Sequence, residues 1–393
     1  MLKRAVAYTY PWDFAGDPEA AGRSASLGLD TVAVAASYHV TRAATPLHPA
    51  RRIFHARDAA CYTPLRPEAW RGHRLVPAPP RSDRDSGSFV DARNQLSAQG
   101  LRVYAWIVLS HNSTLGGQHD DLVVRNAYDD LYPYALCPSQ DDVREYCRTL
   151  VTEILASTPL DGVVLEACGP MGLDHGSHHD KTQLAGWNPT QRQMLSLCFC
   201  TACRERYSAA GLDGDRLATR IRAGVEAVGS DAPMSIEDWL GEDDANAVGT
   251  VRTGIAGELR ALLVDSCHTD AQGLQIVVHG SSDRWATGSF STLQPRVGDG
   301  VNTVVANCWD VSAGEERIRE LRTLAPASTD VGAYLRLSSD WEPGQATDRL
   351  LASYLAAGAS ELHLYNLGLL GRAGLSRLTA LVNTARRLTS TGR

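Results

Sequence analysis

Short apolar segments recur along the chain, and helical patterns separate most of them. Eight segments of five to eight residues are rich in Val, Ala, Leu and Ile, and most are continuous rather than alternating. Continuous apolar runs are typical of parallel strands that are buried on both faces of a sheet. The predicted strands are Ala5–Thr9, Thr31–Ala36, Arg102–Leu109, Gly162–Glu166, Leu274–His279, Val301–Asn307, Val331–Leu337 and Glu361–Tyr365.

Amphipathic helical patterns precede the second to fifth, the seventh and the eighth of these strands. Eight strands that alternate with helices predict an α/β fold, a (β/α)8 TIM barrel. An open, doubly wound sheet is the alternative. The first strand is not followed by the G-x-G-x-x-G turn of dinucleotide-binding sheets, and this favours the barrel.

We expect one barrel domain over residues 1–393, with two long insertions. Residues 40–87, after the second strand, are rich in Pro, Arg and His and poor in periodicity. Residues 168–248, after the fourth strand, contain a loop and helical patterns. Both insertions follow the carboxyl ends of strands, where barrel enzymes hold their sites, so we expect them to cover the barrel mouth.

The charge pattern excludes some classes of partner. The net charge is -7, and the basic residues are spread along the chain rather than clustered. This argues against nucleic acid and against an anionic membrane as partners. The first residues read as a strand rather than as a secretory signal, and the nine cysteines are odd in number, so we expect a cytoplasmic protein with reduced thiols. The sequence gives nothing on the oligomeric state.

The predicted strand ends carry aromatic, amide and charged side chains. In a closed barrel the residues just past each strand converge on one cavity. Sugars suit such a cavity, because their C–H faces stack on aromatic rings and their hydroxyl groups need donors and acceptors. The expected carbohydrate-binding residues are Tyr10, Trp12, Asp13, His39, Trp106, His111, Asn112, His178, His179, Asp283, Arg284, Asn307, Trp309, Arg336 and Tyr365.

Cleavage of a glycosidic bond requires two carboxyl groups. Glu166 ends the fourth strand, and we expect burial to raise its pKa so that it serves as the acid/base. The other interpretation is a structural carboxylate paired with Arg284 or Arg336. Asp310, after the sixth strand, is the predicted second carboxylate, ahead of Asp283, Glu342 and Asp13.

Two motifs around the fourth strand carry a family resemblance. The segment CPSQDDVREY, followed by DGVVLE at 161–166, resembles the CP-x4-VR-x-Y helix and D-G-[VI]-x-[LF]-[ED] strand of glycoside-hydrolase-like (β/α)8 barrels. LSLCFCTACRERY at 195–207 is similar to a cysteine-bearing segment in many of those proteins. The resemblance covers residues 100–210. It implies that Glu166 is the acidic residue at the end of the fourth strand, and it leaves the substrate open.

Two groups of residues suggest metal ligands. The first is the DHGSHHD loop, whose residues His175–Asp180 have the right chemistry but match no standard ligand spacing. The second is Cys198, Cys200 and Cys203, which form a structural zinc site if Cys168 supplies a fourth ligand. Partly buried thiols at a helix start are the other interpretation. We expect no metal or other cofactor at the active site.

The sequence therefore predicts a hydrolase of carbohydrate metabolism, a glycosidase that acts on a small carbohydrate or glycoside. Glu166 and Asp310 are its expected catalytic pair. Two alternatives stay open. One is a metal-dependent hydrolase or isomerase that uses the His175–Asp180 loop. The other is a carbohydrate-binding barrel without catalysis.

Overall fold

Eight parallel strands close into a barrel in the computed structural model, which describes residues 2–174, 181–271, 273–337, 341 and 343–390. Hydrogen bonds join the strands in the order β1–β2–β6–β9–β10–β12–β13–β14, and β14 pairs with β1 to close the ring. The predicted TIM barrel is thus confirmed. The strands are β1 (Arg4–Thr9), β2 (Thr31–Tyr38), β6 (Arg102–Val108), β9 (Gly162–Glu166), β10 (Gln275–Ser281), β12 (Thr303–Asn307), β13 (Asp330–Arg336) and β14 (Glu361–Tyr365).

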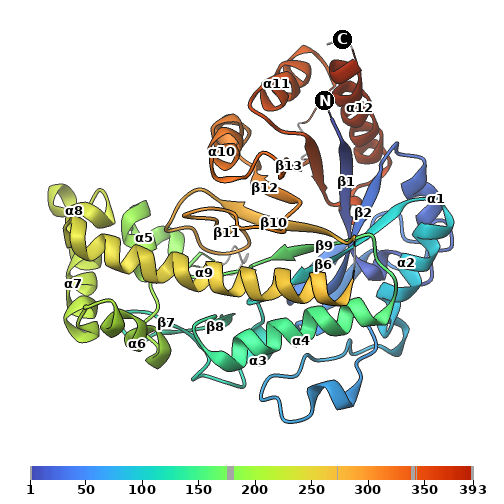
Figure 1. Cartoon of the computed structure of the whole chain (residues 1–393). Coiled ribbons are helices and arrows are strands. Elements are labelled where there is room, and N and C mark those ends of the chain that lie inside the picture. Colours follow the sequence, from blue (N-terminus) through green and yellow to red (C-terminus); the bar gives the residue numbers. More distant parts are fainter. Residues whose placement is uncertain (1, 175–180, 272, 338–340, 342, 391–393) are drawn as a thin grey trace.

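Helices cover the outside of the barrel (Figure 1). The longest, α9, lies alongside α4. In α4 the buried residues Val143, Tyr146, Leu150 and Ile154 recur every three or four positions, as in a helix that packs one face on a sheet. The barrel helices are α1 (Ala20–Ala25), α2 (Ser88–Ala98), α4 (Asp141–Ser157), α9 (Glu242–Asp270), α10 (Val311–Leu324), α11 (Gln345–Ala356) and α12 (Arg372–Ser390).

The loops at the carboxyl ends of the strands contain further structure. After β2 come β3 (Thr41–Ala44), β4 (Ile53–Ala56), β5 (Ala60–Cys61), η2 (Pro67–Trp70) and η3 (Asp83–Asp85). After β6 come α3 (Ser113–Gly116) and a hairpin of β7 (Val123–Arg125) and β8 (Leu131–Leu136). After β9 come η4 (Thr182–Ala185), α5 (Pro189–Leu195), α6 (Thr201–Ala209), α7 (Gly214–Glu226), η5 (Gly229–Asp231) and α8 (Ile236–Leu240). Short elements η1 (Pro11–Asp13), β11 (Ser291–Thr292) and η6 (Leu367–Leu369) follow other strands.

The residues that the structure describes form two hydrophobic cores. The first lies between the barrel strands and their helices. The second lies among the β7–β8 hairpin, α5–α8 and part of α9, where Tyr132, Met194, Tyr207 and Ile221 are buried. The loop and helices after β9 therefore pack on a core of their own beside the barrel mouth.

The barrel interior is polar along part of its length. In β14 the residues Glu361, His363 and Tyr365 alternate with Leu362 and Leu364, and successive strand residues point to opposite faces. Tyr8 of β1 bonds to His279 of β10, which is not a neighbouring strand, so these side chains meet inside the ring. Within the residues that the structure describes, no helix has both the length and the apolarity needed to cross a membrane.

Candidate active site

Glu166 ends β9 and lies at the carboxyl end of the barrel. Its Oε2 accepts a 2.7 Å hydrogen bond from Nε1 of Trp106 on β6, and lies 3.4 Å from Nδ1 of His279 on β10. The side chain is 7% exposed, so it is nearly but not fully withdrawn from solvent. The next residue, Ala167, has a φ of 54°, in the left-handed region that non-glycine residues avoid. Backbone strain of this kind concentrates at functional sites.

The contacts of Glu166 differ from those of a structural ion pair with arginine. Arg284 donates to Asn246 and lies over the ring of Trp285, and Arg336 lies over the ring of Trp309. The partners of Glu166 that the structure describes are the indole N–H and the imidazole. These are hydrogen-bonding groups that position a carboxylate without holding it in a guanidinium clamp.

The pKa of Glu166 lies below its ordinary value. Burial alone raises a carboxyl pKa, but the imidazole of His279, the charge of His39 and the Trp106 N–H together outweigh burial. The sequence-based expectation of a raised pKa was therefore wrong in direction, because it considered burial without these neighbours. Glu166 therefore stays ionised to a lower pH than an ordinary glutamate, and it needs a neighbour to supply a proton before it can act as an acid.

Aromatic side chains line the site next to Glu166. Trp309 is 38% exposed, and its ring stacks on Tyr334 with a centroid distance of 5.9 Å. The ring of Tyr365 is 5.3 Å away, and the Arg336 guanidinium lies 5.1 Å from the centre of the indole. These residues follow β12 or belong to β13 and β14. An exposed indole with a cationic neighbour suits a ligand that has apolar C–H faces and hydroxyl groups.

A cluster of hydroxyl groups and imidazoles completes the described mouth. The hydroxyl of Tyr10 lies 2.7 Å from that of Tyr365 and 3.2 Å from that of Tyr38. Burial raises the pKa of each of these tyrosines, so they stay protonated and available as donors. The rings of His39 and His111 stack with centroids 4.3 Å apart, and burial lowers the pKa of His39.

Five of the expected substrate-binding residues are engaged in stacking or hydrogen bonds within the protein. Trp12 is fully buried and stacks between Tyr10 and Phe54, so its ring faces are occupied. Asn112 is buried as the N-cap of α3, where its Oδ1 accepts from the Leu115 amide. Arg284 extends toward Asn246 at α9, as described above. The carboxylate of Asp283 accepts from the Trp285 amide and from Gln193. Asn307 accepts from the Trp309 amide and fixes the turn after β12.

Asp13 ends η1, the turn after β1. It is 9% exposed, and its Oδ2 accepts from the Thr9 hydroxyl and the Tyr10 amide. Its Oδ1 has no hydrogen-bond partner among the described residues. Burial raises the pKa of Asp13 to about 7, although both hydrogen bonds lower it.

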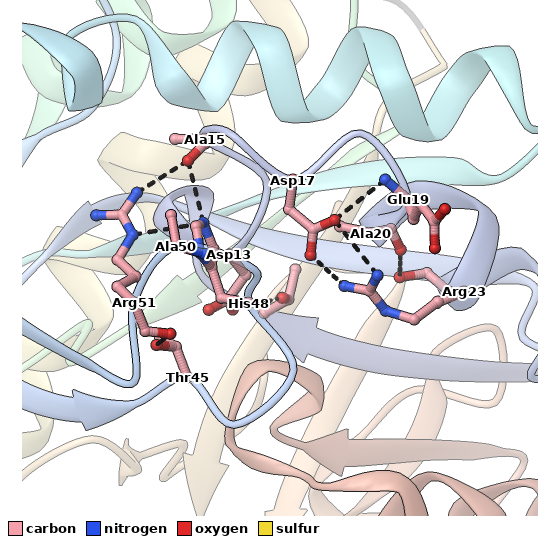
Figure 2. A network of polar contacts seen from close by, with 12 residues as sticks. Asp13, Ala15, Asp17, Glu19, Ala20, Arg23, Thr45, His48, Ala50 and Arg51 are labelled. Carbon is pink, nitrogen blue, oxygen red and sulfur yellow. Dashed lines mark hydrogen bonds and ion pairs between the residues drawn. The ribbon is translucent and has the colours of Figure 1, made fainter.

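A cavity of about 50 Å³ adjoins Asp13 and is lined in part by His48 and Arg23. In Figure 2, His48 and Arg51 both reach the carbonyl of Ala15, and Arg23 pairs with Asp17. Because the Ala50 amide donates to Nδ1 of His48, Nε2 carries the proton that binds Ala15. This network holds the loop before β4 against the turn after β1.

Asp310 is the N-cap of α10. Its Oδ1 accepts from the amide and the hydroxyl of Ser312, at 3.1 Å and 2.6 Å. These bonds lower the pKa of Asp310, and the side chain is exposed. None of its described contacts involves Glu166. The capping role explains an aspartate after this strand without any catalytic role.

Several sequence predictions lie outside the described residues. These are His178 and His179, the rest of the loop from His175 to Asp180, and Glu342.

Sequence reasoning missed the polar interior of the barrel. His279 ends a predicted strand and is absent from the predicted site, although its Nδ1 lies 3.4 Å from Oε2 of Glu166. Tyr334, His363 and Glu361 are absent from the predicted site as well. The signal was the alternation E-L-H-L-Y in the last strand, because polar residues at every second position of a strand share one face.

Four buried cysteines gather beside the second core. The Sγ atoms of Cys137, Cys198, Cys200 and Cys203 all lie within 4.8 Å of one another. The fourth member is thus Cys137, which follows β8, rather than the expected Cys168. The Cys137 sulfur lies 3.5 Å from that of Cys203 and 3.7 Å from that of Cys200. A tetrahedral zinc ion with Zn–S bonds of about 2.3 Å requires sulfur atoms about 3.8 Å apart.

The thiols of this cluster shift one another's pKa. Hydrogen bonds from the other thiols lower the pKa of Cys200, and the same bonds raise the pKa of Cys137 and Cys203. The donor set of four sulfur atoms fits a structural zinc ion.

Comparisons with known proteins agree with the fold. No protein-family model matches the sequence, and no curated protein matches it significantly. Among solved structures, α-L-fucosidase isoenzyme 2 from Paenibacillus thiaminolyticus is 13% identical with a TM-score of 0.58, over 100% of this chain and 50% of that chain. The PgaB (BpsB) glycoside hydrolase domain from Bordetella bronchiseptica is 14% identical with a TM-score of 0.58, over 96% and 98% of the two chains.

The β-galactosidase from the psychrophilic Marinomonas ef1 is 11% identical with a TM-score of 0.59, over 99% of this chain and 60% of that chain. The chain thus spans about half of the fucosidase and 60% of the β-galactosidase. At these identities the similarity is one of fold. The chain thus shares a (β/α)8 barrel fold with these glycoside hydrolases.

Proposed function

We propose that the protein hydrolyses a glycosidic bond and that Glu166 is the carboxyl group that transfers the proton. One observation carries the proposal: Glu166 ends β9 at the barrel mouth, held by Trp106 and His279. Because barrel enzymes react at this face, the position favours a catalytic role. Nδ1 of His279 lies 3.4 Å from Oε2 of Glu166, so this nitrogen is placed to exchange a proton with the carboxyl group.

The surrounding groups support a small carbohydrate as the substrate. The exposed ring of Trp309 offers a stacking surface, and Arg336, Tyr365 and His39 offer polar contacts beside it. Asp310 remains the proposed second carboxylate, because it is ionised and follows β12, the strand between β10 and β13. Its capping bonds to Ser312 are the argument against it.

The first experiment is a screen of 4-nitrophenyl glycosides and short oligosaccharides. On a substrate that is cleaved, Glu166→Gln is expected to reduce kcat by at least about 100-fold, the usual contribution of a general acid or base. The affinity for the product sugar, measured by calorimetry, is expected to persist. Glu145→Gln, an exposed carboxylate on α4 that pairs with Arg148, is the matched control. Unchanged turnover in Glu166→Gln would remove Glu166 from the mechanism.

Asp310→Asn tests the second carboxylate in the same assay. Asparagine is as good an N-cap as aspartate, so α10 keeps its cap while the negative charge is lost. A loss of turnover comparable to that of Glu166→Gln supports Asp310 as the partner. Full turnover assigns Asp310 to the helix cap alone.

A carbohydrate-binding barrel without catalysis is the second candidate. The observation in its favour is that Asp310 is engaged in capping α10, while Glu166 is almost fully buried. This candidate predicts that sugars bind and that neither wild type nor Glu166→Gln releases product from any glycoside in the screen. The two candidates therefore differ in turnover and agree in binding.

We further propose that Cys137, Cys198, Cys200 and Cys203 hold one structural zinc ion. The ion would join the end of the β7–β8 hairpin to the start of α6, and so brace the second core beside the mouth. Zinc has no redox chemistry, and four thiolates leave no open ligand position, so this site would stabilise the fold rather than react.

Metal analysis of the purified protein tests the zinc site. We expect one zinc per chain, and cobalt substitution is expected to give the thiolate-to-metal absorption of a tetrahedral site with four thiolate ligands. Cys198→Ser should lower the zinc content, whereas Cys147→Ser, a buried cysteine of α4 outside the cluster, should not. A metal-free wild type with a native fold would contradict the proposal.

A further inference from the structure

A continuous chain of polar side chains crosses the barrel interior. Arg4 pairs with Glu361 at 2.5 Å, and Glu361 lies 3.2 Å from Nε2 of His363. The Tyr8 hydroxyl lies 3.0 Å from Nδ1 of His363. The same hydroxyl lies 2.8 Å from Nε2 of His279, whose Nδ1 faces Glu166 at 3.4 Å. Tyr8, His279, His363 and Glu361 are fully buried, so the chain connects opposite ends of the barrel without exposure to solvent.

The chain has a direction, which is set at the Arg4 end. Nη1 of Arg4 donates to Oε1 of Glu361, and a carboxylate that pairs with a guanidinium only accepts hydrogen bonds. Nε2 of His363 must therefore carry a proton. Burial lowers the pKa of His363, so the ring is neutral and its Nδ1 is an acceptor. Tyr8 then donates to His363, and its oxygen accepts from Nε2–H of His279.

With the hydrogen bonds donated in this order, Nδ1 of a neutral His279 ring carries no proton. The bare nitrogen faces Oε2 of Glu166, and it has no hydrogen-bond partner among the described residues. Two lone pairs that face each other at 3.4 Å in a buried site repel, whereas one proton between them converts the contact into a charge-assisted hydrogen bond.

We propose that Glu166 and Nδ1 of His279 share one proton, and that Tyr8, His363 and Glu361 hold it there by fixing the tautomer of His279. These three are positioning residues, because they act through His279 and not on a substrate. The proton leaves Oε2 of Glu166 when a substrate oxygen accepts it, and a proton from solvent restores the pair. This role of the pair in catalysis rests on the proposed function, whereas the shared proton does not.

Other titratable groups surround the pair. The charge of His39, which follows β2, also lowers the pKa of Glu166. Tyr38 of β2, Tyr334 of β13 and Tyr365 of β14 are close enough to interact electrostatically with Glu166. The ring of His279 stacks on Phe290 at 4.6 Å. Burial raises the pKa of the three tyrosines, so they remain neutral while the pair titrates. His39 is the neighbour whose charge also changes in the acid range.

Nitrogen NMR of the histidine rings in the full-length protein tests the proposal. In wild type we expect His279 to be protonated at Nε2, with its Nδ1 signal moving as Glu166 titrates. Tyr8→Phe removes the acceptor of Nε2–H, so Nε2 is expected to release its proton to solvent. The remaining proton is then expected to stay on Nδ1 and to donate to Glu166. Tyr146→Phe is the control, because it removes a buried hydroxyl of α4 that accepts from Asn112 and has no contact with this chain among the described residues.

Glu361→Gln provides a second variant that leaves the neighbours of His279 intact. The glutamine N–H donates to Nε2 of His363, which reverses each hydrogen bond of the chain. Tyr8 then donates to Nε2 of His279, which releases its proton to solvent, and the remaining proton stays on Nδ1. A wild-type His279 with a bare Nε2 and a protonated Nδ1 would overturn the proposal. These signals do not depend on turnover, so an inactive protein with the expected tautomer would refute the proposed function and leave the shared proton intact.

Discussion

Asp13 is a buried carboxyl group that is stabilised in its protonated form. Its pKa is about 7 in the folded protein and about 3.9 in an unfolded chain, so the folded state binds more protons between these values. The stability that this proton supplies is complete below about pH 4 and is lost as the pH rises to about 7. The difference corresponds to at most about 4 kcal/mol.

Asp13→Asn is therefore expected to stabilise the protein above about pH 7 and to change it little at about pH 4. The amide oxygen of asparagine retains the bonds from Thr9 and Tyr10, and no buried charge forms. Denaturant unfolding at pH 5, 6, 7 and 8 measures the effect. A stability difference that does not grow with pH would contradict the raised pKa.

Trp106 holds Glu166 in its ionised form through a 2.7 Å hydrogen bond. Trp106→Phe keeps an aromatic ring and removes the donor, so the pKa of Glu166 is expected to rise. Carbon NMR of labelled glutamate side chains reads this pKa directly. Trp70→Phe, a buried tryptophan that packs on Tyr146, is the control and should leave the Glu166 titration unchanged.

Among the single elements, α10 depends on its N-cap residue, Asp310. Asp310→Ala removes the acceptor for the Ser312 amide and should lower the melting temperature, whereas Asp310→Asn should not. Calorimetry on both variants separates the helix cap from any catalytic role, because only the alanine variant loses the cap. Equal melting temperatures for all three proteins would show that this cap contributes nothing to stability.

The elements also explain which parts of the site the sequence predicts. Glu166 is recognisable because it directly ends an apolar strand, and a strand end fixes its place at the mouth. Cys137 cannot be recognised from the sequence as a member of the cysteine cluster. It is 61 positions away from Cys198, and only the β7–β8 hairpin brings the two residues together. Trp12 and Asn112 share the strand-end position of Tyr10 and His111, and local turns bury them. Such turns depend on tertiary packing and not on strand position.

At the scale of the whole molecule, the two cores differ in what holds them together. The barrel closes through strand pairing, which needs no ion, whereas the second core contains the four cysteines. We expect chelation of zinc to lower the stability of the second core first and to split thermal unfolding into two steps. A single unchanged transition in the presence of chelator would contradict this account.

Most of the eight strands are predictable because they are buried on both faces and therefore read as continuous apolar runs. The interior chain from Arg4 to Glu166 was not predictable, because its members come from four strands that are separated by long stretches of sequence. Only the order of strands around the ring brings them into contact. Whole-molecule topology thus determines the chemistry of Glu166 as much as its own position does.

The role of Glu166 in proton transfer is tested most directly by comparing the loss of kcat/KM in Glu166→Gln between substrates with different leaving groups. A proton donor matters most for a poor leaving group, so the loss in kcat/KM should be large for an alkyl glycoside and small for a dinitrophenyl glycoside of the same sugar. This graded loss is the predicted result. An equal loss for both glycosides would show that Glu166 does not transfer the proton, and the account would fail.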